Sequence, residues 1–276
     1  MILALGVPLP VYVKPWKYFD IDAIMVSAYY ILKSNLVRSS VLEKGLKDYL
    51  DFDGMVILDS GVFQLINSGK TIKLEEVLDI YRSIDGVDIK LSFDYPDDRI
   101  IEQYLKLRHY EVQPVIPADQ HYLVEYFKNE KCQWMFIGRL AKVLRNQGNH
   151  GLRFLEETCS NFQKTSNKKL WAMGVGNFKT LPILSESRFA GADTSSYRVA
   201  AAYGDIIVPG KGTQHVSGRK KGKKDWGMRM AEEDDLERYL DALGLKYQDL
   251  EESFEKRVIF NAYVVTHHIA SSRLWL

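Results

Sequence analysis

Apolar positions recur along this chain with two different periods. Short, nearly continuous runs rich in Val, Ile, Leu and Phe are typical of strands buried on both faces, as in parallel sheets. They lie at 23–29, 55–60, 88–95, 111–118, 134–140, 169–176, 188–193 and 205–210. Between them, the segments 73–84 and 97–110 carry apolar residues at helical spacing. Strands that alternate with helices predict βαβ units and a parallel sheet.

About eight such strands predict an α/β fold of the (β/α)8 TIM barrel type, which takes about 250 residues. An open doubly wound sheet is the alternative. The chain has 276 residues, and no linker or low-complexity segment divides it, so we expect one domain over 1–276 with a helical C-terminus. The apolar N-terminus carries Pro8, Pro10 and Pro15 without a basic leader, which favours a first strand or barrel plug over a signal peptide.

Composition narrows the class of protein. The hydrophobic fraction of 46% is ordinary for a globular core. No apolar run reaches the roughly 18 residues of a membrane span, so no membrane partner is expected. Only two cysteines are present, Cys132 and Cys159, which favours a reducing, cytoplasmic compartment over a disulfide framework.

Positive charge is concentrated in one segment, although the net charge of the chain is only +1. The basic loop, residues 211–229, contains one acid, Asp225, among its basic residues. These are Lys211, Arg219, Lys220, Lys221, Lys223, Lys224 and Arg229. Such a cluster attracts polyanions such as nucleic acid. A solvated loop without a partner is the alternative.

Three of the predicted strands end in aspartate, at Asp59, Asp94 and Asp193. A single aspartate in such a place is usually a helix cap or a turn residue. In a parallel barrel, however, the C-terminal ends of the strands form the active-site rim. Three carboxylates on one rim therefore indicate catalysis, with a nucleophile, a general acid/base and a group that reads a polar ligand edge.

Five short motifs give these aspartates a context. They are "AYYILKS" at 28–34, "LDSGVFQ" at 58–64, "LSFDYP" at 91–96, "FIGRLAK" at 136–142 and "AMGVG" at 172–176. In content and order they resemble the motifs of the tRNA-guanine transglycosylase family. The chain looks most like the branch of that family that modifies DNA. The resemblance implies a (β/α)8 barrel, in agreement with the strand pattern.

The resemblance also implies a reaction, the exchange of guanine in a nucleic acid for a 7-deazaguanine base of the preQ0 kind. By their places in the motifs, Asp193 is the nucleophile, Asp59 the general acid/base and Asp94 the reader of the purine edge. Phe63 and Met173 are expected to sandwich the base. The remaining motif residues are implied in substrate binding, namely Ser60, Gln64, Gly138, Arg139, Leu140 and Gly174.

The chain departs from the family pattern in several places. A base-contacting glutamine is missing from "PVIPAD", where Asp119 or Gln120 is the candidate substitute. Arg139 stands where the family has glycine, and is expected to hold a phosphate or to pair with one of the aspartates. The family's cysteine cluster is absent, so we expect no metal site and no cofactor. His267 and His268 are then helix residues.

These departures favour DNA over tRNA as the substrate, with the free 7-deazaguanine base as second substrate. Flanking phosphates are expected to contact Arg198, Arg219, Lys220, Lys221, Lys223 and Lys224. Members of the family often dimerise, which makes a homodimer possible. Three alternatives stay open: action on tRNA, a non-catalytic partner subunit of such an enzyme, and an unrelated barrel enzyme that binds a phosphorylated small molecule through 208–212.

Overall fold

The structure is a computed structural model that describes residues 1–62, 73–93, 99–141, 144, 150–216 and 230–272, with side chains up to His267. It contains two compact units. The barrel unit comprises Met1–Val11 and Asp22–Thr194, and the helical unit comprises Tyr12–Ile21 and Ser195–Leu276. That residues 1–276 form a single domain stays a prediction.

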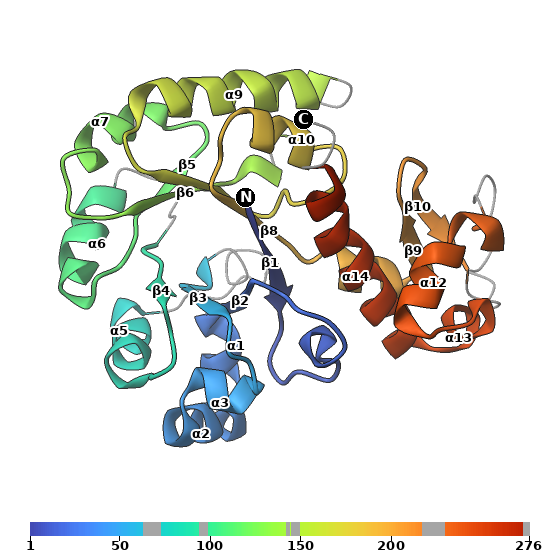
Figure 1. Cartoon of the computed structure of the whole chain (residues 1–276). Helices are drawn as coiled ribbons and strands as arrows, with labels where there is room; N and C mark the ends of the chain where they lie inside the picture. The colour runs from blue at the N-terminus through green and yellow to red at the C-terminus, as the bar shows by residue number, and fades with distance from the viewer. Residues whose placement is uncertain (63–72, 94–98, 142–143, 145–149, 217–229, 273–276) are drawn as a thin grey trace, which may run out of the picture. The chain divides into compact units, whose positions relative to one another are not determined.

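An eight-stranded parallel sheet forms the barrel unit, with its strands in the order β4-β3-β2-β1-β8-β7-β6-β5 (Figure 1). The outer strands β4 and β5 meet at a parallel bridge between Leu91 and Gln113, where the Gln113 N–H donates to Lys90 O at 2.7 Å. The predicted (β/α)8 barrel is confirmed. Its strands are β1 Ile2–Val7, β2 Ala23–Ser27, β3 Met55–Asp59, β4 Ile89–Lys90, β5 Val115–Pro117, β6 Trp134–Gly138, β7 Lys169–Ala172 and β8 Gly191–Thr194.

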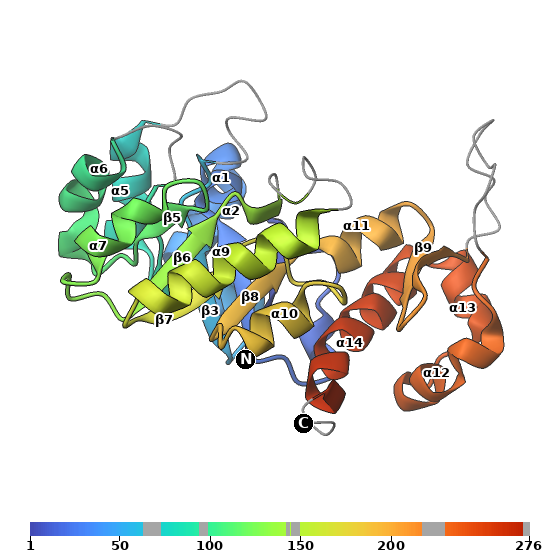
Figure 2. The ribbon, with the colours of Figure 1, turned by 90° about the horizontal axis from the view of Figure 1, so that it is seen from above.

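Helices connect these strands and lie outside the sheet (Figures 1 and 2). The predicted helices at 73–84 and 97–110 are confirmed as α5 and α6, the second continued by a short 3₁₀ turn at Arg108–Tyr110. Among the described residues of this unit, the helices are α1 Ala28–Lys33, α2 Asn35–Lys44, α3 Leu46–Leu50, α5 Leu74–Ser83, α6 Ile100–Leu107, α7 Val124–Phe127, α9 Gly151–Thr165 and α10 Leu181–Glu186.

Apolar side chains from β1 through β7 and the residues next to them fill the barrel interior. This cluster consists of Ala4, Ala23, Met25, Ile57, Ile89, Leu91, Val115, Trp134, Phe136 and Trp171, with Met173 packed against it. Side chains alternate between the two faces of a strand. The side chain two positions beyond an interior residue therefore also faces the barrel axis, which places Ser27 after Met25 and Asp59 after Ile57 at the C-terminal mouth.

One predicted strand does not belong to the barrel. The run at 205–210 forms β9 (Asp205–Val208), which pairs antiparallel with β10 (Gly212–His215) in the helical unit. The remaining barrel strand is β1, from the apolar N-terminus, which pairs with both β2 and β8. The prediction that 205–210 is one of the parallel strands was wrong. A buried apolar run has the same sequence pattern in a parallel and in an antiparallel strand, so the pattern does not distinguish them.

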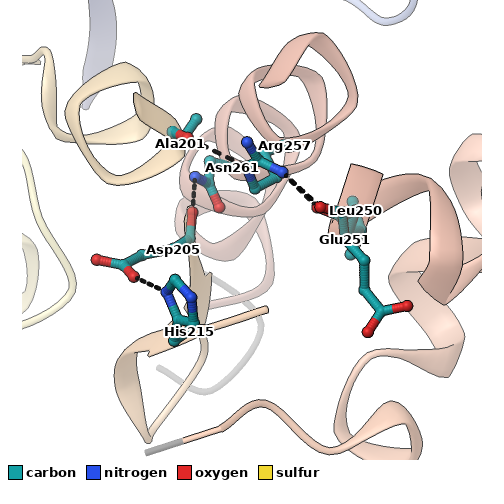
Figure 3. A network of polar contacts seen from close by, with 7 residues as sticks. All are labelled: Ala201, Asp205, His215, Leu250, Glu251, Arg257 and Asn261. Atoms are coloured by element: carbon teal, nitrogen blue, oxygen red, sulfur yellow. Dashed lines mark hydrogen bonds and ion pairs between the residues drawn. The ribbon is translucent and has the colours of Figure 1, made fainter. Parts of the chain in front are cut away.

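In the helical unit, α14 (Phe254–Ser272) packs against α11 (Ser196–Ala202), α12 (Glu237–Leu243) and α13 (Tyr247–Glu252). Arg257 of α14 donates to Ala201 O at 3.0 Å and to Leu250 O at 2.7 Å (Figure 3). Asn261 accepts from Ile207 N at 2.7 Å and donates to Tyr197 O at 2.9 Å. The described residues after Met230 thus include the three helices α12, α13 and α14. Within the described residues, no helix has the length and apolar character needed to cross a membrane.

Candidate active site at the mouth of the barrel

Asp59 is the last residue of β3 and lies level with Ser27 of β2. Its Oδ2 accepts from Gly61 N at 3.1 Å, and the Ser27 side chain also hydrogen-bonds to it. Burial raises the pKa of the Asp59 carboxyl to about 6, although these donors and the Ser60 N–H act to lower it. Asp59 thus makes the local contact of a turn residue and also has the pKa of an acid/base group.

The backbone after Asp59 requires glycine. Gly61 has φ of +85°, and a Cβ there would lie 2.7 Å from Tyr29 N. Ser60 lies within this turn and is fully buried. The Ser60 Oγ has no hydrogen-bond partner within the described part of the chain. Its predicted role in substrate binding therefore rests on a buried, available hydroxyl beside Asp59.

Asp193 lies in β8, beside Ala4 of β1, and is only 8% exposed. Each of its carboxylate oxygens accepts one hydrogen bond. The Trp171 Nε1–H donates to Oδ1 at 3.1 Å, and the Gly174 N–H donates to Oδ2 at 3.1 Å. The pKa of Asp193 is raised to about 7, mainly by burial and to a smaller extent by the Asp59 charge, although the N–H groups of Trp171, Gly174 and Asp193 itself act to lower it.

The electrostatic effect of Asp59 on Asp193 links the two carboxyls across the barrel mouth. They come from β3 and β8, which are far apart in the sequence. Two interacting carboxyls with raised pKa values titrate near neutral pH, so over part of that range one can be ionised while the other is protonated. That combination suits a nucleophile paired with a general acid.

The loop after β7 explains the motif "AMGVG". Gly174 has φ of +70°, and its N–H reaches Asp193. The Gly176 N–H donates to Asp193 O at 2.9 Å, and a Cβ on Gly176 would lie 2.9 Å from that oxygen. Both glycines therefore hold the end of β8. Met173 packs against the interior cluster and is partly exposed at the mouth.

Arg139 follows Gly138, the last residue of β6, with φ of +62°, in the left-handed region that favours glycine. Its Nη1 lies 3.6 Å from Asp119 Oδ1, so the cation pairs with the residue considered as a substitute for the missing glutamine. The Arg139 side chain is mostly buried, whereas that of Asp119 is largely exposed. Leu140, the next residue, is buried.

Several predicted site residues cannot be placed. Phe63, Gln64, Asp94, Arg219, Lys220, Lys221, Lys223 and Lys224 lie outside the described residues. Arg198 lies on α11 in the helical unit. Among the described residues, no group of three or more His, Cys, Asp and Glu side chains is arranged to hold a metal ion.

The sequence analysis missed two residues that contact the carboxyls, Trp171 and Ser27. The alternation along β7 provides a signal for Trp171, because it precedes Met173 by one strand period and so faces the same interior. Ser27 ends the apolar run of β2 and stands level with Asp59. The sequence signal for Ser27 was a polar residue at the end of a buried apolar strand.

Comparisons with known proteins point to one group of enzymes. No protein family model matches the chain. It is 38% identical over 84 residues to the tRNA-guanine(15) transglycosylase of Pyrococcus furiosus, which is 30% of this chain and 14% of that protein. For the enzyme of the same name from Haloferax volcanii, the identity is 41% over 79 residues, 28% of this chain and 15% of the relative.

A third relative, the tRNA-guanine(15) transglycosylase of Nanoarchaeum equitans, is 35% identical over 85 residues, 30% of this chain and 20% of that protein. The match therefore spans a fifth or less of each of these three relatives. Within the matched segment, the similarity supports the resemblance to tRNA-guanine transglycosylases that the motifs indicated.

Proposed function

We propose that this chain is a transglycosylase that exchanges guanine in DNA for a 7-deazaguanine base of the preQ0 kind. The observation that supports this most directly is the carboxyl pair Asp59 and Asp193, both with raised pKa values at the C-terminal mouth of a parallel barrel. The partial similarity to tRNA-guanine transglycosylases supports the same reaction class.

In the first half of the proposed reaction, an ionised Asp193 oxygen attacks C1′ of the nucleotide. The bond from C1′ to the guanine nitrogen breaks, and its electron pair leaves with the base. Asp59, protonated in the reactive form, gives its proton to the departing guanine. This form is the minor one of the two singly protonated states, because the pKa of Asp193, about 7, lies above that of Asp59, about 6. The products are free guanine, an ionised Asp59 and an ester that joins Asp193 to the sugar.

In the second half, ionised Asp59 takes the ring N–H proton of the incoming 7-deazaguanine. The freed nitrogen attacks C1′, the ester bond to Asp193 breaks, and its electron pair returns to the carboxylate. Both carboxyls are then in their starting states. This is the two-step logic of a retaining glycosidase, with a base in place of water.

The remaining predicted residues take supporting roles in this proposal. Asp94 reads the two adjacent donors of the guanine edge, since a carboxylate has two acceptor oxygens. Phe63 and Met173 hold the faces of the base, and Ser60, Gln64, Gly138, Leu140 and Gly174 line its site. Arg139, paired with Asp119, places a cation at the same rim.

DNA as the substrate is supported by the basic loop at 211–229, whose charge suits a grip on phosphates without recognition of a folded RNA. A second candidate is action on tRNA, which the names of the similar proteins favour. Either substrate must present an unpaired or extruded nucleotide, because C1′ attack is blocked within a stacked duplex.

Labelled-guanine exchange distinguishes these candidates. Purified protein is incubated with duplex DNA, single-stranded DNA and tRNA, and the covalent adduct is trapped and identified by mass spectrometry. We expect exchange and adduct on DNA, and loss of both in Asp193→Ala. Asp53→Ala, which removes an exposed carboxylate before β3, should behave as wild type.

Exchange on tRNA with none on any DNA would reverse the choice of substrate. If neither nucleic acid forms an adduct, the proposed reaction is wrong. An adduct formed by the Asp193→Ala variant would instead show that Asp193 is not the nucleophile.

A further inference from the structure

Trp171 contacts the Asp193 carboxylate from inside the barrel. The residue is fully buried, with its ring stacked on Phe136 at a centroid distance of 5.4 Å and edge-on to Trp134 at 5.9 Å. These rings fix the plane of the indole. Its Nε1–H therefore has one direction, and it meets Asp193 Oδ1 at 3.1 Å.

The chain makes room for this indole with a glycine in β8. A Cβ on Gly191 would lie 2.2 Å from Cε3 and Cζ3 of Trp171, far inside van der Waals contact. Glycine in a strand interior normally weakens the strand. Its place two positions before Asp193 lets the ring of β7 pack against β8, directly beside the carboxylate that it contacts.

The two donors to Asp193 come from one segment, β7 and its following loop, and each donates to a different oxygen. With both oxygens held, the carboxylate cannot rotate about its Cβ–Cγ bond without losing a hydrogen bond. Each oxygen still has an unused acceptor direction, since a carboxylate offers about four. The arrangement orients the group and leaves it able to attack.

Neutral donors suit a nucleophile better than a cation would. An arginine or lysine beside an aspartate lowers the pKa by about 1–3 units and makes the carboxylate a weaker base. Hydrogen bonds from uncharged N–H groups stabilise the ionised form less and are directional. Phenylalanine would also supply an aromatic ring to the interior, so the indole nitrogen is the part of Trp171 that packing alone does not require.

We propose that Trp171 is a positioning residue for Asp193, whose indole N–H holds the carboxylate ionised and oriented for attack on C1′. This role rests on the proposed transglycosylase function. In this role, a residue of the barrel interior takes part in the reaction through its contact with Asp193 and without the need to contact the base.

The test is Trp171→Phe, which keeps an aromatic ring and removes the donor. The matched control is Trp134→Phe, which alters a neighbouring interior indole that does not donate to Asp193. The rate of covalent adduct formation is measured in a single turnover from pH 5 to 9. Melting curves of all variants report folding.

For Trp171→Phe we expect the acid limb of the rate profile to move up by about one pH unit, so that the rate on that limb falls about tenfold. Trp134→Phe should keep the wild-type limb. A uniform fall at every pH, or an unchanged profile, in Trp171→Phe would show that Trp171 only packs and would overturn the proposal.

A second measurement uses the unmutated protein, in case Trp171→Phe does not fold. The indole N–H resonances are followed by NMR across the same pH range. One of them should titrate with a midpoint near that of Asp193, about 7, and stop titrating in Asp193→Asn. If no indole N–H resonance titrates, the Trp171 N–H does not sense the charge on Asp193, and the proposed contact is wrong.

These outcomes separate the two proposals. Wild-type protein that forms no adduct refutes the transglycosylase function, whereas the indole titration tests the contact independently of any reaction.

Discussion

At the scale of single residues, Asp59 and Asp193 are both carboxyls with raised pKa values but differ in how their charge is stabilised. Asp59 accepts from its own turn and from Ser27, whereas Asp193 accepts from Trp171 and Gly174 of the neighbouring strand and loop. Burial raises both pKa values, to about 6 and about 7, and the Asp59 charge adds to the rise at Asp193. Their titrations are therefore coupled, and pH controls both roles.

The first prediction is a bell-shaped pH dependence of exchange, with its maximum between about pH 6 and 7. As pH falls below this range both carboxyls become protonated and the nucleophile is lost. As pH rises above it both become ionised, and no proton is available for the departing guanine. Measured kcat/KM from pH 4.5 to 9 checks this, and a profile that does not fall on both sides of pH 6–7 would contradict it.

Asp59→Asn gives a related prediction. Exchange should slow by about 10²-fold, the typical contribution of an acid/base group. The pKa of Asp193, followed by NMR of its side chain, should also fall, because removal of the Asp59 charge takes away a contribution that raises it. A near-normal rate would reduce Asp59 to a turn residue, and an unchanged or higher pKa of Asp193 would contradict the coupling of the two carboxyls.

At the scale of elements, the β7–loop–β8 segment positions the nucleophile. Gly191 admits the Trp171 ring, and Gly174 and Gly176 bring backbone N–H groups to Asp193. The strands themselves pair at Trp171 with Gly191 and at Ala172 with Ala192. The carboxylate is therefore supported by regular β structure on one side and by a glycine turn on the other.

Gly191→Ala should destabilise the protein by about 1–3 kcal/mol, the usual cost of overpacking a core. The added methyl group would lie 2.2 Å from the Trp171 ring, and neither the strand nor the ring has space to yield. Urea unfolding measures the change. In a Trp171→Phe background the cost should be smaller, because the six-membered ring of the indole is gone. Equal costs in both backgrounds would mean that the ring is not the obstacle.

At the scale of the whole molecule, the chain divides into the barrel unit and the helical unit. The barrel mouth holds the carboxyl pair, whereas Arg257 and Asn261 tie α14 to its neighbours in the helical unit (Figure 3). The basic loop at 211–229 belongs to the sequence of the helical unit. We infer that the reacting carboxyls and the residues that contact the nucleic acid phosphates belong to different units.

Replacement of Lys220, Lys221, Lys223 and Lys224 by glutamine should weaken nucleic acid binding and flatten its salt dependence. On duplex DNA each lost phosphate contact reduces the slope of log K against log salt by nearly one. Binding titrations at several salt concentrations measure this. A control variant that neutralises the exposed Lys44, Lys131 and Lys164 should keep the slope. An unchanged slope in the first variant would make the loop a solvated one without a phosphate partner.

The sequence by itself determined most of the barrel strands, two of the helices and the candidate carboxyls of this protein. Periodicity is a local property, so β2 through β8, α5 and α6 could be predicted from neighbouring residues. The aspartates at the ends of β3 and β8 followed from the rule that barrel chemistry gathers at those ends. The motif glycines were recognised without the reason for them, which is their contact with Asp193.

Only the tertiary structure decided which strands pair and which side chains meet. The run at 205–210 has the local pattern of a barrel strand, but its partner is β10, and pairing depends on residues distant in sequence. The contacts of Trp171 with Asp193 and of Arg139 with Asp119 join different strands or loops, so no spacing along the chain encodes them. The pKa values depend on burial in three dimensions, because desolvation acts only once the barrel has closed around the carboxyls.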